Sequence, residues 1–165
     1  MGERSRHHIQ PARALHLVGE ELPASASASA ELRFELVAEP ESVPAVRRVA
    51  CAVANAVGMP EERLEDLKLA VTEAAANVAV HAYRDDPRPG MVELTVSSNG
   101  GWLVVLVCDR GSGPQPRLDS SGLGLGIGLM SALADGCRIG HRRGGGTEVE
   151  LRFAVRDAGP RGISA

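Results

Sequence analysis

Three polar side chains recur at four-residue intervals in an alanine-rich stretch of the chain. Glu73, Asn77 and His81 lie in a segment that reads Thr-Glu-Ala-Ala-Ala-Asn-Val-Ala-Val-His-Ala-Tyr from residue 72 to residue 83. At this spacing the three side chains share one face of a helix. The residues alone leave two interpretations open. The face is either a polar edge, or a site in which the Asn77 oxygen binds a hard cation and the Glu73 carboxylate accepts a proton.

A second group of residues suited to chemistry follows an apolar run, residues 102–108. The run ends on the carboxylate of Asp109, and Gly111 and Gly113 come next. Glycine is needed where backbone approaches a neighbour too closely for a Cβ, or where φ is positive. The pattern therefore predicts a strand end that brings a carboxylate and bare backbone close to a flat ligand. A glycine-rich surface loop is the alternative.

Four more glycines occupy alternate positions in the run Gly-Leu-Gly-Leu-Gly-Ile-Gly, residues 122–128. An apolar segment with helical spacing follows, so the run is expected to lead directly into the N-terminus of a helix. Free N–H groups and the positive end of the helix dipole make such a terminus a phosphate site. A dinucleotide-binding fingerprint fits less well, because its glycines share one tight strand-to-helix turn. Here a loop separates Asp109 from the glycine run.

Composition bounds the size and class of the protein. The 165 residues are 44% hydrophobic, which suits one core and one domain. The formal charge is -3, with acids and bases interspersed, and aromatic residues are few, so neither a nucleic-acid nor a membrane surface is indicated. The three cysteines are far apart, which favours reduced core residues over a zinc site or a disulfide. No apolar run matches a membrane span and no signal peptide is evident, so we expect a cytoplasmic protein.

Hydrophobic periodicity predicts the elements that must position these residues. Alternation of apolar and polar side chains is typical of half-buried strands, and apolar residues three and four apart are typical of helices. The Asn99-Gly100 pair between two apolar runs is a strong hairpin signal. Strands are expected at residues 31–38, 91–97, 102–109, 137–142 and 147–155. Helices are expected at about residues 40–58, 61–82 and 126–134.

These elements predict an α/β (α+β) two-layer sandwich, in which about three helices cover a mixed, mostly antiparallel sheet of about five strands. In the last strand, charged residues at positions 148, 150 and 152 alternate with apolar ones, so one face belongs to the core and the other to solvent. The domain is expected to span residues 31–156. Residues 1–30, which end in Ala-Ser repeats, and residues 157–165 are expected to be flexible tails.

Four of these motifs, in this order, resemble those of the gyrase, chaperone, histidine-kinase and mismatch-repair (GHKL) ATPase superfamily. Residues 73–83 are similar to its N box, residues 109–113 to its first glycine box, residues 124–130 to its second, and Gly146-Thr147 to the Gly-Thr pair that follows. The resemblance covers about residues 31–155. A short chain with Glu-x-x-x-Asn-x-x-x-His-Ala-Tyr and Gly-x-Gly-x-x-Leu-Met is most similar to the bacterial anti-sigma factor serine/threonine kinases.

The resemblance implies that the ligand is an adenine nucleotide, and it indicates which residues bind the adenine base. The Asp109 carboxylate would accept a hydrogen bond from the adenine amino group, which is the contact that distinguishes adenine from guanine. Thr147 would support this contact directly or through water. Gly111 and Gly113 would let the base approach the backbone.

The resemblance also implies that the nucleotide is ATP bound with Mg²⁺, and it indicates which residues act at the phosphates. Asn77 would hold the magnesium ion that bridges the phosphates, and Glu73 would act as general base on the acceptor hydroxyl. His81 and Tyr83 would pack beneath the site. The backbone N–H groups of the second glycine box and its flank would bind the phosphate tail. The residues concerned are Gly122, Leu123, Gly124, Leu125, Gly126, Ile127 and Gly128.

Protein partners are implied by the same resemblance, because the kinases of this kind bind a sigma factor and phosphorylate a serine of an anti-sigma-factor antagonist. Neither nucleic acid nor membrane is expected as a partner, and a homodimer is left open. Residues 1–30 are too short and too rich in alanine and serine for the dimerisation hairpin of a sensor histidine kinase. The alternative of another class is a module that binds ATP or a partner without phosphorylating it, although Glu73 favours chemistry.

Overall fold

The computed structural model describes residues 30–84, 90–113 and 123–155. Apart from Ala30, the expected tails at residues 1–30 and 157–165 lie outside the described residues. So do Gly122 and most of the segment between the two glycine boxes.

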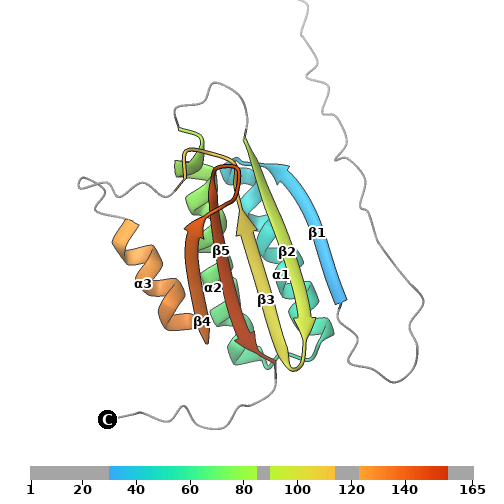
Figure 1. Ribbon diagram of the computed structural model, residues 1–165. Helices are drawn as coiled ribbons and strands as arrows, with labels where there is room; N and C mark the ends of the chain where they lie inside the picture. The colour runs from blue at the N-terminus through green and yellow to red at the C-terminus, as the bar shows by residue number, and fades with distance from the viewer. Residues whose placement is uncertain (1–29, 85–89, 114–122, 156–165) are drawn as a thin grey trace, which may run out of the picture.

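Five strands form one sheet in the order β1-β2-β3-β5-β4, and every neighbouring pair is antiparallel (Figure 1). The sequence predicted a mixed, mostly antiparallel sheet of this size, and the four observed pairings are all antiparallel. β3 is the central strand, so Asp109, which follows it directly, lies at the middle of one end of the sheet. The strands are β1 (Ala30–Val37), β2 (Met91–Asn99), β3 (Trp102–Cys108), β4 (Gly136–His141) and β5 (Thr147–Ala154).

Helices cover one face of this sheet, and within the described ranges none lies over the other face (Figure 1). The three expected helices are α1 (Val43–Ala56), α2 (Glu61–Asn77) and α3 (Leu123–Leu133), and α3 packs beside α2. A 3-10 turn, η1 (Pro40–Ser42), precedes α1, and α2 continues into a π-helical turn, η2 (Val78–Ala82). Among the described residues, no helix has both the length and the apolar character needed to cross a membrane.

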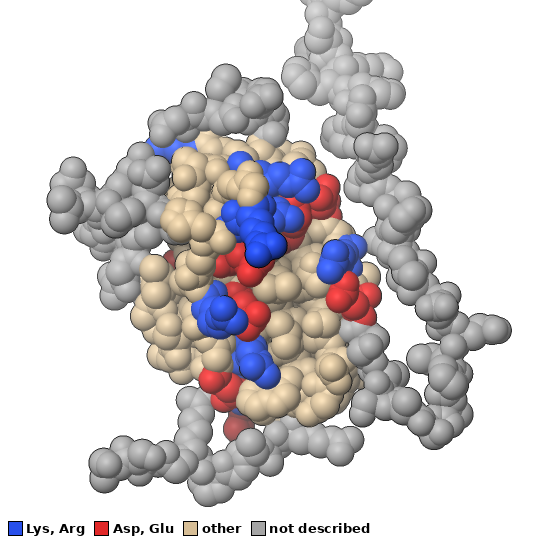
Figure 2. Space-filling model, in the orientation of Figure 1, with Lys and Arg blue, Asp and Glu red and all other residues tan. Residues whose placement is uncertain are grey.

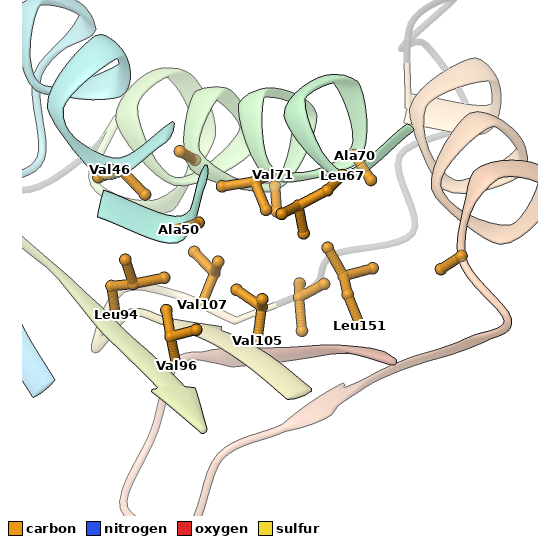
Figure 3. Packing of buried hydrophobic residues seen from close by; sticks show 14 of the residues in the cluster. Val46, Ala50, Leu67, Ala70, Val71, Leu94, Val96, Val105, Val107 and Leu151 are labelled. Atoms are coloured by element: carbon orange, nitrogen blue, oxygen red, sulfur yellow. The ribbon is translucent and has the colours of Figure 1, made fainter. Parts of the chain in front are cut away.

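The core lies between the helices and the inner face of the sheet. The alternation predicted for the last strand is confirmed, because Val149, Leu151 and Phe153 are buried whereas Glu148 and Arg152 are exposed. Burial of such apolar side chains is the main favourable term in folding, and it fixes α2 against the sheet. Figure 3 shows the side chains that meet across the two layers, among them Val46, Ala50, Leu67, Val71, Leu94, Val105, Val107 and Leu151.

The buried stripe of α2 determines where its polar residues lie. Leu67, Val71 and Ala74 are completely buried, while Glu73 and Asn77, offset around the helix from this stripe, are half-buried. Because α2 is anchored through its apolar stripe, Glu73 and Asn77 lie at the margin of the helix layer. Glu73 lies where α2 faces α3, against Gly126, and Asn77 is the last residue of α2.

Candidate functional site

Asp109 is a buried carboxylate at the end of the central strand. The residue is 2% exposed. Its Oδ1 accepts hydrogen bonds from Gly111 N at 2.8 Å and Thr147 N at 3.2 Å, which offset the cost of burying a charge. Among the described residues none donates to Oδ2, and no fully buried side-chain oxygen in that part of the chain lacks a partner. Oδ2 is therefore the carboxylate oxygen left to accept a hydrogen bond from a ligand.

Two glycines allow the backbone to close around this carboxylate. A Cβ on Gly111 would lie 1.9 Å from the carbonyl oxygen of Ala82, which ends η2, and Ser112 N donates to the same oxygen at 3.0 Å. A Cβ on Gly146 would lie 2.0 Å from the carbonyl oxygen of Asp109. The N box, the first glycine box and the Gly-Thr pair, which are far apart in the sequence, thus meet at one strand end.

Gly113 is the last residue described before the segment that leads to the second glycine box. Its φ of 79° lies in the left-handed region that favours glycine. A Cβ there would lie 3.1 Å from Nδ1 of His141 and 3.4 Å from the carbonyl oxygen of Gly146. The first glycine box therefore ends beside the β4–β5 turn.

Tyr83 holds the same strand end from the other side. Its hydroxyl accepts a hydrogen bond from Arg110 N at 2.8 Å and donates one to the carbonyl oxygen of Met91, also at 2.8 Å. Its ring occupies the space that a Cβ on Gly90 would need. Tyr83 therefore ties the end of η2 to the start of β2 and to the residue after Asp109, a structural arrangement of the kind expected for it. His81 is half-buried within η2.

The second glycine box lies against Glu73. A Cβ on Gly126 would lie 2.1 Å from Oε1 of Glu73 and 2.8 Å from its Cδ, whereas a Cβ on Gly128 would meet nothing within 4 Å. Gly126 is buried. The lack of a side chain at position 126 therefore gives the Glu73 carboxylate its place between α2 and α3.

Gly124, Gly126 and Gly128 lie inside α3 and not before it. The sequence placed the start of this helix at about Gly126, whereas the helix begins at Leu123. An α-helix leaves only its first four N–H groups without an intrahelical partner. Among the described residues, the backbone donors that α3 can offer to an anion are therefore those of residues 123–125, because the N–H of the fourth helical residue, Gly126, makes the first intrahelical bond. Ile127 and Gly128 lie deeper in the helix, where N–H groups bond to carbonyls of the preceding turn.

Two titratable groups on the outer face of the sheet have shifted pKa values. The Arg142 guanidinium lowers the pKa of the Glu93 carboxyl, against the opposite effect of burial. Burial, with a smaller contribution from Glu148, raises the pKa of the Cys108 thiol to about 11. Cys108 is therefore a neutral thiol at physiological pH and a poor nucleophile. It is a free, buried cysteine as expected, but it lies on the outer side of the sheet and is not part of the core cluster between the two layers.

The apolar pattern gave no sign of a role for Glu93, Arg110 and Arg142. Alternation in β2 puts Glu93 on the outer face, but its partners come from two loops that are distant in sequence, and only the pairing of the strands brings them together. In the described parts of the chain, no three His, Cys, Asp or Glu side chains are grouped as metal ligands.

Comparisons with known proteins agree with this geometry. The family model for the histidine kinase-like ATPase domain matches residues 36–153. A protein of Bacillus subtilis (strain 168) named serine-protein kinase RsbW is 31% identical over 128 residues, which cover 68% of this chain and 79% of that protein. The protein of the same name from Bacillus velezensis is 32% identical over 123 residues, covering 66% and 76%.

A solved structure shares the fold. The crystal structure of the RsbU and RsbW domains of a Mycobacterium tuberculosis protein superposes with a TM-score of 0.61 at 24% sequence identity. The match covers 76% of this chain and 32% of that longer chain. The fold with a five-stranded antiparallel sheet and three helices is therefore also found in a solved structure.

Proposed function

The chain belongs to the histidine kinase-like ATPase family, and from this premise we propose that it is a cytoplasmic protein serine kinase of the anti-sigma factor type. It transfers the γ-phosphate of ATP to a serine of an antagonist protein and also binds a sigma factor. The observation that carries the proposal is the Glu73 carboxylate, which lies against Gly126 between α2 and α3. The names of the relatives, which are serine-protein kinases, support it.

At the adenine end of the site, the side chain of Asp109 recognises the base. Oδ1 is occupied by the N–H groups of Gly111 and Thr147, so Oδ2 accepts from the 6-amino group of adenine. Guanine carries a carbonyl at this position, and two acceptors facing each other leave both without a donor. Thr147 supports the carboxylate through its backbone N–H.

At the phosphate end, the N-terminal turn of α3 and the polar face of α2 act together. The free N–H groups of residues 123–125 hold the phosphate tail. Asn77 would hold Mg²⁺ through its side-chain oxygen, and the ion would supply positive charge against the phosphates. Glu73 accepts the proton of the serine hydroxyl as the serine Oγ forms its bond to the γ-phosphorus. The bond from that phosphorus to the bridging oxygen breaks, and ADP leaves.

Incubation of the chain with γ-labelled ATP and candidate serine-bearing antagonists tests the proposal. Label on a serine of an antagonist supports the kinase. Stable binding of ATP and of a partner, with the label remaining on the nucleotide, would instead favour a module that acts by binding alone.

Replacing Asp109 by asparagine tests whether this side chain recognises the adenine base. The asparagine oxygen can keep both N–H bonds at the Oδ1 position, which puts its NH₂ group where Oδ2 lies and turns a donor toward the adenine amino group. We expect the free energy of ATP binding to weaken by about 1 to 3 kcal/mol, the range for mispaired buried groups. Calorimetric titration measures this change, with the unfolding midpoint as the control for folding. An unaltered ATP affinity would place the adenine contact elsewhere.

A further inference from the structure

A second carboxylate, Glu93, joins two loops of the site from the outer face of the sheet. Its Oε1 lies 2.8 Å from Nε of Arg110 and 2.7 Å from Nη1 of Arg142, and its Oε2 lies 2.5 Å from Nη2 of Arg142. Arg110 directly follows Asp109. Arg142 begins the β4–β5 turn, and its N donates to the carbonyl oxygen of Gly146 at 3.1 Å. Figure 2 shows acidic and basic side chains side by side on this face of the molecule.

The loops that Glu93 joins are the same two that Asp109 joins from within. Oδ1 of Asp109 bridges Gly111 N, in the loop after β3, and Thr147 N, at the end of the β4–β5 turn. Glu93 pairs in register with Cys108, the residue before Asp109. The strand end is thus held between two carboxylates, the buried one of Asp109 and the one of Glu93 on the outer face.

The Arg142 contact carries most of this restraint. The Glu93 and Arg142 side chains are 17% and 25% exposed, and their contact is bidentate, which is the stronger geometry for a charged pair. The Arg110 side chain is 66% exposed, and a pair so open to solvent contributes little. The bridge to the β4–β5 turn is therefore the one that matters.

We propose that Glu93 is a positioning residue that sets the preference of the site for adenine over guanine, acting through Arg142 on the turn that orients the Asp109 carboxylate. The inference rests on the proposed binding of ATP. An acceptor distinguishes an amino group from a carbonyl only while its direction is fixed. When the turn loosens, Thr147 N no longer holds Oδ1, and the carboxylate can rotate away from either base.

The test compares the ATP and GTP dissociation constants of the full chain with those of Glu93→Gln, a change that keeps shape and removes charge. We expect ATP to bind about five- to twentyfold more weakly and GTP to change less than twofold, so that the ATP/GTP preference narrows. Arg142→Gln should reproduce this effect, and Arg110→Gln should show a smaller one. Glu150→Gln is the matched control, because Glu150 lies on the outer face of β5 away from both loops.

The outcomes separate this inference from the function on which it rests. A parent chain that binds ATP no better than GTP would overturn the proposed adenine site, and the role of Glu93 with it. A parent chain that prefers ATP, with Glu93→Gln and Arg142→Gln both folded and both keeping that preference, would overturn the role of Glu93 alone. Equal weakening of ATP and GTP in both variants would also overturn it, because that is the effect of a general loss of structure.

Discussion

The Glu73→Gln variant is expected to bind ATP as tightly as the parent chain and to transfer its phosphate about 10²- to 10⁴-fold more slowly, the usual range for a positioned general base. Glutamine is close to glutamate in size, so it fits the same place against Gly126. It cannot accept the proton of the serine hydroxyl. Because phosphoryl transfer also depends on positioning and charge stabilisation, the lower part of this range is compatible with the role.

Asn77→Ala provides the contrast, since Asn77 lies one turn further along the same helix face. Loss of an oxygen ligand to magnesium should weaken magnesium-dependent ATP binding first, and every later step with it. ATP affinity and single-turnover transfer to the antagonist are therefore measured on both variants. Transfer by Glu73→Gln at the parental rate, or loss of binding alone in both variants, would contradict the assignment of the base.

The Gly146→Ala variant is expected to lose both stability and ATP binding. The φ of Gly146 is 95°, where a side chain costs about 1 to 3 kcal/mol. The added Cβ would also lie 2.0 Å from the Asp109 carbonyl oxygen and 2.7 Å from Cα of Arg110, and overpacking of this kind costs a further ~1 to 3 kcal/mol. Since both atoms belong to the strand end that carries the site, we expect ATP affinity to fall at least about tenfold.

Gly145→Ala is the matched control for this prediction. Gly145 has a φ of 104°, but a Cβ there would meet nothing within 4 Å. It should therefore lose stability through backbone strain alone and keep its ATP affinity. Urea unfolding and calorimetric titration of the two variants measure these effects. Equal losses of ATP affinity in both would show that the contact with Asp109 does not matter.

The fold could be predicted from the sequence where a local pattern was enough. Alternation in the last strand, the Asn99-Gly100 hairpin and the apolar stripe of the helix before Tyr83 each have a short period that the sequence displays directly. Five strands and three helices followed, and the structure confirms them. The start of α3 was placed too late, because the helix propensity of glycine is a weak guide when packing against α2 favours the helix.

The site residues named from the sequence remain predictions, and the contacts that join them could not be derived from their spacing. The sequence singles out Asp109 by its place after an apolar strand. It does not show that Thr147 contacts Asp109 through its backbone N–H, because that contact depends on the β3–β5 pairing. The contact of Gly126 with Glu73 joins two helices far apart in the chain. The bridges from Glu93 likewise depend on tertiary structure, because no spacing in the sequence connects it with Arg142.

The most direct test of the central claim, that this strand end forms an adenine-nucleotide site, is a calorimetric titration of the parent chain with ATP and with GTP, each with and without Mg²⁺. We expect ATP to bind in a magnesium-dependent manner and GTP to compete poorly, because guanine presents a carbonyl where the Asp109 carboxylate needs a donor. Competition by GTP equal to that of ATP would contradict the claim.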